Sequence, residues 1–247
     1  MFGVGGESND HGAGGGGMTR LWRALARFMG DPSHRSTRLL RLFPPHGLFQ
    51  PEAHTALDRY PKVFRFAADE LGREAPLRLL SFGCSTGEEL LTLRGYFPRA
   101  RIVGLDISRH NVRMSRKAAS GDPGIVVRRA SSAADEPVAA YDAIFAMAVF
   151  RHADLGSPAI ASSERLIRFE RFEAEAGKLA RRLRPGGLLF ITHSNFRFRD
   201  AAAAADFDVV LRDESLELGE PSRLFDRQDQ LMPGETYEDI GFRKRPS

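Results

Sequence analysis

The stretch that decides the fold is Leu79-Leu80-Ser81-Phe82-Gly83-Cys84-Ser85-Thr86-Gly87-Glu88-Glu89. It begins as an apolar run of strand length and continues into a turn of small residues that opens a helix. In a doubly wound sheet, ligands bind beyond the carboxyl ends of the strands, where this turn lies. Small residues let the backbone approach a ligand, and a helix N-terminus favours an anionic group. The stretch therefore predicts a strand, a ligand-binding loop and a helix.

Apolar runs of strand length alternate with helical stretches along the chain after Pro76. This alternation predicts a parallel sheet covered by helices on both faces. Two more short strands, Phe207–Leu211 and Tyr237–Lys244, are separated by a polar, Pro-bearing stretch, which predicts an antiparallel finish. The expected strands before them are Leu77–Phe82, Arg101–Leu105, Ile125–Val127, Ala143–Phe150 and Leu188–Thr192, and the expected helices are Glu88–Phe97, Arg109–Ala119 and Ser163–Arg184.

The N-terminal part of the chain has a different texture. Residues 1–17 contain eight of the 24 glycines, so we expect a flexible leader that lies outside the fold. Residues 18–75 predict a helical segment that packs on the core, with helices at Leu21–Met29, Leu39–Phe43 and Val63–Leu71. The last of these stops at Gly72, a residue typical of helix C-termini. Residues 76–247 then form the ligand-binding domain.

Composition excludes several classes of protein. The chain has 247 residues, of which 42% are hydrophobic, enough for a substantial core. It lacks the long apolar run that crosses a membrane, and its start does not resemble a signal peptide. A single cysteine, Cys84, makes neither an internal disulfide nor a cysteine-rich metal site, so we expect a reducing, cytoplasmic compartment and no metal. The net charge of +4 comes from arginines spread along the chain, which does not favour nucleic acid as a partner.

A carboxylate follows the glycine-rich loop at an informative distance. Asp106 stands 19 residues after Gly87, at the end of the next expected strand. A carboxylate there can accept hydrogen bonds from the hydroxyls of a ribose, as in nucleotide-binding folds. Two alternatives stay open: a tight turn without a ligand, and an Asp106 that, with Ser108, only caps the next helix.

The charges around the loop bear on the kind of nucleoside. A dinucleotide site favours a third glycine where Glu88 stands, to make room for the pyrophosphate. Glu88 and Glu89 repel a diphosphate but tolerate a ligand that carries an ammonium group. S-adenosylmethionine has a ribose, an ammonium, a carboxylate and a sulfonium, and no phosphate. It suits this loop better than a dinucleotide does.

From Leu77 to Phe196 the chain resembles the class I S-adenosylmethionine-dependent methyltransferases. Tyr141–His152 is similar to the family's Asp-led fourth strand with its following loop, and Leu179–Thr192 to its helix, turn and fifth strand. The resemblance implies a three-layer, Rossmann-like α/β fold with a mostly parallel seven-stranded sheet and an antiparallel last strand. It implies S-adenosylmethionine as cofactor, bound by Phe82, Gly83, Cys84, Ser85, Gly87, Glu88, Asp106, Ile107, Ser131 and Met147.

The chain also departs from the family pattern. Many members carry an acid where this chain has Ser81, and another after the third strand, where Ser131 or the backbone would contact the adenine here. No Asn/Asp-Pro-Pro-aromatic sequence follows the fourth strand, which argues against methylation of a base nitrogen. The wording from Gly83 to Glu89 is also similar to the first loop of chemotaxis-type protein-glutamate methyltransferases.

The resemblance places His152 and His193 just beyond the fourth and fifth strands, where either is a candidate general base. Arg151 is a candidate for binding an acidic substrate, and Cys84 is better interpreted as a small loop residue than as a nucleophile. A small molecule or a protein side chain is the favoured methyl acceptor; nucleic acid stays open but is not favoured. Two other functions stay open, a non-catalytic S-adenosylmethionine- or nucleoside-binding module and a dinucleotide-dependent oxidoreductase. The oligomeric state is not predicted.

Overall fold

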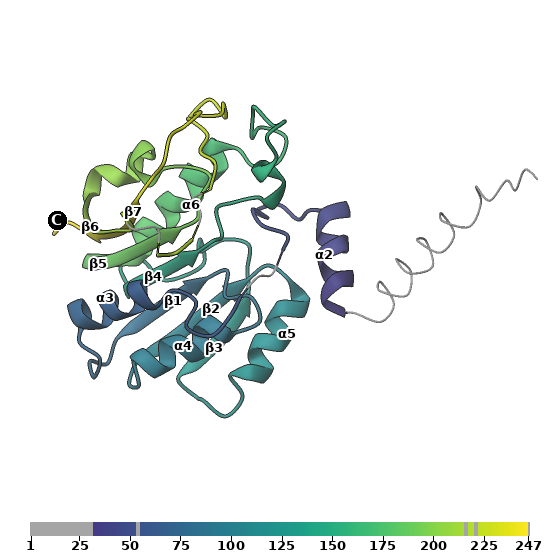
Figure 1. The fold of residues 1–247 in the computed structure, drawn as a ribbon. Helices are drawn as coiled ribbons and strands as arrows, with labels where there is room; N and C mark the ends of the chain where they lie inside the picture. The colour runs from purple at the N-terminus through teal and green to yellow at the C-terminus, as the bar shows by residue number, and fades with distance from the viewer. Residues whose placement is uncertain (1–31, 53–54, 215–216, 220–221, 247) are drawn as a thin grey trace, which may run out of the picture.

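A seven-stranded sheet in the order β3-β2-β1-β4-β5-β7-β6 forms the centre of the protein (Figure 1). The computed structural model describes residues 32–52, 55–214, 217–219 and 222–246. Strands β1 to β5 run parallel, and β7 is antiparallel to both β5 and β6. The predicted α/β fold with an antiparallel finish is thus confirmed. The strands are β1 (Arg78–Phe82), β2 (Arg101–Asp106), β3 (Ile125–Arg129), β4 (Tyr141–Met147), β5 (Leu183–Thr192), β6 (Phe207–Arg212) and β7 (Asp239–Lys244).

Helices cover both faces of the sheet, and side chains of each strand alternate between the two faces. Leu79 of β1 packs in the cluster with α3, α4 and α5, whereas Leu80 packs in the cluster with α6. Both leucines are fully buried. The helices of the first face are α3 (Pro61–Leu71), α4 (Glu88–Tyr96) and α5 (Arg109–Ala118); on the second face α6 (Phe169–Arg182) is joined by the short 3₁₀ helices η2 (Phe198–Asp200) and η3 (Ala202–Asp206).

Several element boundaries differ from the prediction. The helix expected at Leu39–Phe43 starts earlier, as α2 (Pro32–Leu42), and three further differences have a local reason. Strand β4 ends at Met147 rather than Phe150, because Ala148 takes a left-handed backbone conformation with φ 56°. Helix α6 begins at Phe169 rather than Ser163, because the Phe169 amide donates to Asp229 Oδ1 at 2.6 Å instead of continuing a helix. Strand β5 begins at Leu183, where a helix was expected to continue, and pairs there with Tyr141 across an irregularity in the register.

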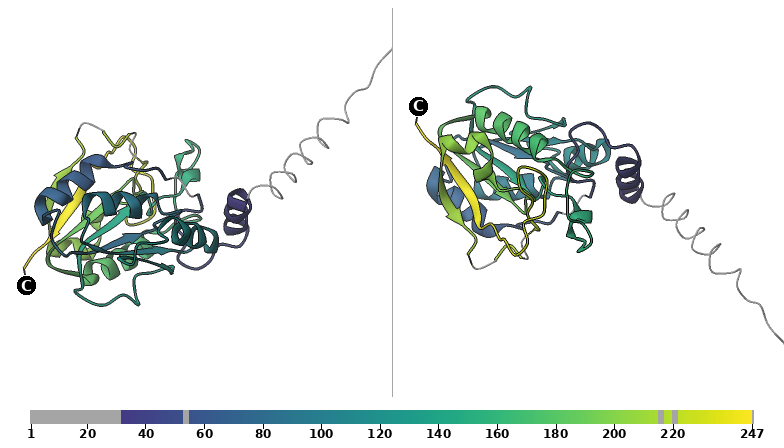
Figure 2. Two further views of the ribbon diagram at one scale, coloured as in Figure 1. Left: turned by 90° about the horizontal axis from the view of Figure 1, so that it is seen from below. Right: turned by 90° about the horizontal axis from the view of Figure 1, so that it is seen from above.

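The described part of the N-terminal segment contains α2, an irregular stretch and α3. Helix α2 (Pro32–Leu42) has no buried residue and lies at the periphery in all three views (Figures 1 and 2). Residues 43–52 then cross the carboxyl edge of the sheet before α3, which ends at Gly72 as predicted. The expected leader 1–17 and the helix Leu21–Met29 lie outside the described residues. Within the described residues, no helix has both the length and the apolar character needed to cross a bilayer.

Candidate functional site

The loop between β1 and α4 is built so that its backbone lies close to neighbouring elements. Gly83 has a φ of 82°, and a Cβ atom at this position would stand 2.4 Å from Val149 Cγ2. Only glycine fits there without strain. The Gly83 and Cys84 amides both donate to Leu105 O, at 2.8 and 2.9 Å, which ties the loop to the end of β2. The loop is therefore held open and rigid beside the strand that carries Asp106.

Gly87 and Cys84, two residues of the predicted loop, serve packing. A Cβ atom on Gly87, whose φ is 107°, would lie 2.9 Å from Ser115 Cα, so this glycine allows α4 and α5 to approach each other. Neither Gly87 nor Glu88 lines a cavity described below. Burial raises the pKa of the Cys84 thiol well above its usual value, which fits a small loop residue and not a nucleophile.

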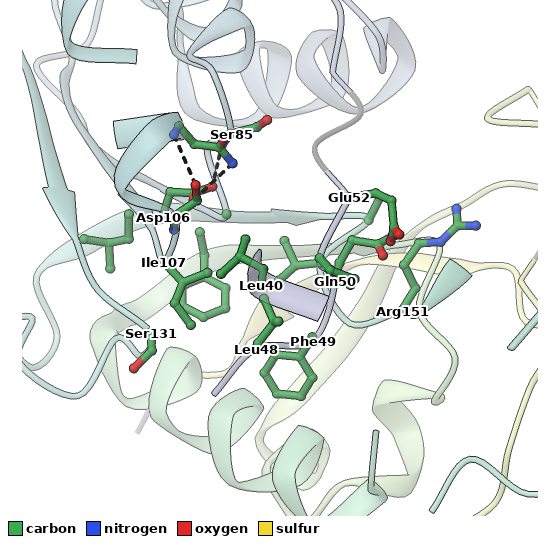
Figure 3. A pocket seen from close by; sticks show the side chains of 18 of the residues that line it. Leu40, Leu48, Phe49, Gln50, Glu52, Ser85, Asp106, Ile107, Ser131 and Arg151 are labelled. Carbon is green, nitrogen blue, oxygen red and sulfur yellow. Dashed lines mark hydrogen bonds between the residues drawn. The ribbon is translucent and has the colours of Figure 1, made fainter. Parts of the chain in front are cut away.

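Asp106 ends β2 and holds the loop and the next helix in place. Its Oδ2 accepts the Ser85 amide at 2.9 Å, and its Oδ1 accepts the Ser108 amide at 2.8 Å and the Asn111 side chain at 3.2 Å (Figure 3). A carboxylate offers about four acceptor positions, so one position of Asp106 remains for a ligand hydroxyl. A second ligand hydroxyl could bind only if the Asn111 side chain turned away. The helix-capping arrangement that the sequence left open is also seen. Ser108 caps α5 with its own side chain, and its amide donates to Asp106. Burial raises the pKa of Asp106 to about 6.

A cavity of about 320 Å³ lies beyond the carboxyl ends of β1, β2 and β4 (Figure 3). The chain builds β1, β2 and β3 outward in one direction and then returns to place β4 on the other side of β1, so the cavity sits at the switch point of the sheet. Its volume falls within the range of small-molecule sites. Seven of the residues predicted to bind a cofactor line it: Phe82, Gly83, Ser85, Asp106, Ile107, Ser131 and Met147.

Glu89 brings a carboxylate next to Ser81, the position at which many family members carry an acid. The Ser81 hydroxyl donates to Glu89 Oε1 at 2.6 Å, so a carboxylate from α4 lies against the end of β1. Burial raises the pKa of Glu89 to about 7, and the charge of Arg59 opposes this rise. Glu89, Arg59 and Cys84 line a small side pocket that shares Gly83, Ser85 and Met147 with the main cavity. The family pattern pointed to the strand end and not to the helix, and for this reason Glu89 was not among the predicted binding residues.

Neither candidate histidine lines the main cavity. The His152 ring accepts the Asp154 amide at 3.3 Å and caps η1 (Ala153–Gly156). His193 lies 5.8 Å, ring to ring, from Tyr60 and borders a separate small pocket near β7. Burial lowers the pKa of both imidazoles. The structure brings neither together with Asp106, and their catalytic role stays a prediction.

The opposite wall of the cavity comes from the segment that crosses the sheet edge. Residues from Gly47 to Glu52 line it together with Leu40, and Arg151 contributes from the chain after β4. Arg41 Nε donates to Glu52 Oε1 at 2.7 Å, and the Phe49 ring packs edge-on against Phe150 at 5.0 Å. Apart from Arg151, sequence reasoning missed this wall, because residues 43–52 carry no motif and meet the sheet only in the fold.

Comparisons with known proteins found a matching family. Residues 52–233 match the model of a family described as a methyltransferase domain. No curated protein matches the chain. Similar solved structures include a putative sarcosine dimethylglycine methyltransferase from Galdieria sulphuraria (20% identity, TM-score 0.39, 53% of this chain and 46% of that one) and a geranyl diphosphate C-methyltransferase from Streptomyces coelicolor A3(2) (18%, 0.38, 53% and 45%). A third is the [4+2]-cyclase SpnF (19%, 0.44, 62% and 59%). The chain spans about half the length of the first two.

The fold and the site define a class I methyltransferase domain. Because the family model matches most of the sequence, the chain belongs to the methyltransferase domain family. The cofactor of this class is S-adenosylmethionine, and the residues present fit it. The cavity offers the carboxylate of Asp106 and a buried Ser85 hydroxyl without a partner, and the adjoining side pocket adds the carboxylate of Glu89. Among the described residues, no group of histidines, cysteines and acids could hold a metal ion.

Proposed function

We propose that the protein transfers a methyl group from S-adenosylmethionine to a small-molecule acceptor. The observation that carries the proposal is the cavity at the switch point, where the β1 loop, Asp106 and Glu89 meet. In this proposal Asp106 accepts a hydrogen bond from the ribose. Ile107 and Ser131 contact the adenine. The chain at Gly47 packs closely against Ser131, because a Cβ atom on Gly47 would lie 2.9 Å from Ser131 O.

The side pocket holds the amino-acid end of the cofactor in this proposal. Glu89 attracts the ammonium group, and Arg59 attracts the carboxylate, because both residues line the same small pocket beside the loop. Glu89 then supplies the charge that the family pattern expects at Ser81. In this proposal Glu89 supplies one of the two acids whose absence favours a non-catalytic module. The second acid, expected after the third strand, is still replaced by Ser131 or the backbone.

When bound, S-adenosylmethionine supplies an electrophilic methyl group on a sulfonium. The protein has to hold the acceptor in line with that group and exclude water. Apolar residues from both sides of the cavity, Leu48, Phe49, Met147 and Val149, serve the exclusion of water. A small acceptor is favoured over a protein or nucleic acid, because residues 47–52 cover the cavity. We also propose a cytoplasmic location, in keeping with a single, buried cysteine.

The test is calorimetric titration of the full chain with S-adenosylhomocysteine and, separately, with NAD. We expect S-adenosylhomocysteine to bind at one site and NAD to bind far more weakly, because Glu89 lies where a diphosphate would approach. Absence of S-adenosylhomocysteine binding, or tighter binding of NAD, would overturn the proposal and favour the oxidoreductase alternative.

A further inference from the structure

The end of the cavity away from Asp106 contains three polar side chains that face one another. Gln50 and Glu52 come from the segment that crosses the sheet edge, and Arg151 comes from the chain after β4. In Figure 3 the three side chains converge, and none of the hydrogen bonds drawn joins them. They therefore form a mixed-charge cluster, brought together from positions about 100 residues apart in the sequence.

Each member of this cluster has a buried polar atom without a hydrogen-bond partner. These atoms are Gln50 Oε1, Glu52 Oε2 and Arg151 Nε. A buried polar atom left unpaired costs roughly 1–3 kcal/mol, so most such atoms in native proteins are paired. Three in one cluster, at the end of a ligand cavity, indicate groups that are satisfied when a ligand is bound.

The charges of the cluster indicate what that ligand carries. Glu52 shares only its Oε1 with Arg41, which leaves Oε2 to accept from a cationic or N–H donor group. The amide oxygen of Gln50 adds a second acceptor beside it. Arg151 lines the cavity and its buried Nε has no hydrogen-bond partner among the described residues, so its guanidinium is available for a carboxylate. A ligand that satisfies all three groups needs an amine and a carboxylate a few atoms apart.

The size of the site restricts the ligand further. A cavity of about 320 Å³ lies at the lower end of the range for small-molecule sites, and the cofactor occupies the end near Asp106 in the proposed function. Because the cofactor and the acceptor share this cavity in the proposed function, the acceptor has to be small. Leu48 and Phe49 line the same cavity and provide apolar surface for the acceptor beside the charged groups.

We propose that Gln50, Glu52 and Arg151 form the acceptor subsite, and that it takes a small zwitterion in which an amine and a carboxylate are close together. The amine lies at Glu52 and Gln50, and the carboxylate at Arg151. The inference rests on the proposed function, because it assigns the acceptor end of the same cavity. The sequence suggested only that Arg151 binds an acidic substrate; the structure adds the opposite charge next to it.

The test measures binding of defined probes to the full chain saturated with S-adenosylhomocysteine, by ligand-observed NMR. The probes are glycine, β-alanine and 4-aminobutanoate, which vary the separation of the charges, with methylamine and acetate as the matched half-molecules. We expect at least one amino acid to bind about tenfold or more tightly than both half-molecules, since two charge-assisted contacts are made instead of one. If no amino acid binds better than methylamine or acetate, the proposal is overturned.

Variants that remove one charge each then assign the two ends. Glu52→Gln and Arg151→Met should each weaken the preferred amino acid about tenfold or more, because each removes one charged contact. The affinity for S-adenosylhomocysteine should stay unchanged in both. The matched controls are Glu170→Gln and Arg165→Met, exposed residues away from the cavity, which should leave probe binding as it is.

Two outcomes separate the inference from the function on which it rests. If Glu52→Gln or Arg151→Met weakens S-adenosylhomocysteine instead of the probe, these residues hold the cofactor's own amino-acid end, and the acceptor subsite is wrong while the proposed function stands. If the wild-type protein does not bind S-adenosylhomocysteine, the proposed function itself has failed.

Discussion

The two ends of the cavity are built in contrasting ways. At the cofactor end, Asp106 accepts three hydrogen bonds from its own neighbourhood, and the loop that it anchors at Ser85 directly follows the end of β1. At the other end, Gln50, Glu52 and Arg151 come from distant parts of the chain and keep unpartnered atoms. The first end is preorganised by local structure, whereas the second is assembled by the fold and, in the proposal above, is completed by a ligand. A common cofactor suits the first design, and a specific acceptor suits the second.

The largest expected effect tests how rigid the cofactor end is. Gly83→Ala should lower the free energy of unfolding by roughly 2–4 kcal/mol, because the new Cβ meets Val149 in a left-handed backbone conformation. Gly186→Ala is the matched control: its φ is 76° but nothing lies within 4 Å, so only about 1 kcal/mol should be lost. Denaturant unfolding measures both, and equal losses would show that the close approach of the loop is unimportant.

The next effect concerns ligand affinity at the cofactor end. Asp106→Ala should weaken S-adenosylhomocysteine by on the order of 100-fold, because hydrogen bonds to charged groups contribute roughly 1.5–3 kcal/mol and the loop loses its anchor at Ser85. Asp135→Ala, an exposed acid elsewhere on the surface, should change nothing. Calorimetry gives both affinities. An unchanged affinity in Asp106→Ala would reduce this residue to a helix-capping role.

Glu89→Gln should change both the pH dependence of stability and the affinity for S-adenosylhomocysteine. Burial raises the pKa of Glu89 from 4.5 to about 7, so the folded protein binds this proton more tightly than the unfolded chain. Its contribution to stability is therefore greatest below about pH 4.5 and is lost as the pH rises to about 7. The variant should show a flatter dependence of Tm on pH over this window, yet bind S-adenosylhomocysteine about tenfold more weakly.

A steeper pH dependence in the variant, or binding as tight as in the wild type, would contradict the assignment of Glu89. The matched control is Glu88→Gln. This residue precedes Glu89 on the same helix but lines neither cavity, so its replacement should leave affinity unchanged.

The smallest effect is expected at His152. Its ring caps the short helix η1 and does not line the cavity, so His152→Ala should cost about 0.5–1 kcal/mol of stability and change the affinity for S-adenosylhomocysteine less than about twofold. Thermal unfolding and calorimetry measure the two quantities. A tenfold loss of affinity would show that the ring reaches the ligand, as the sequence-based prediction of a catalytic base requires.

Local patterns made the fold and one end of the cavity predictable. The loop after β1 and the acid ending β2 follow from short-range rules about strands, turns and helix starts, and both lie where the sequence placed them. Contacts between distant positions left no local signal. Glu89, at the start of α4, contacts Ser81 of β1 across the intervening loop. Gln50 and Arg151 line the same cavity only because the chain crosses the sheet edge. The start of α6 was misplaced for the same reason, since its partner Asp229 lies 60 residues away.

That last contact has a consequence for how the chain folds. The amides in the first turn of a helix have no acceptor within the helix. In α6 the Phe169 amide donates to the side chain of Asp229, a residue 60 positions later in the chain. Ser163 is joined to the same residue through the Asp229 carbonyl at 2.9 Å. The start of α6 is thus a contact of high sequence separation, which forms late because the intervening chain must first be closed into a loop. A nascent chain released before residue 229 would carry an α6 whose opening turn has no cap.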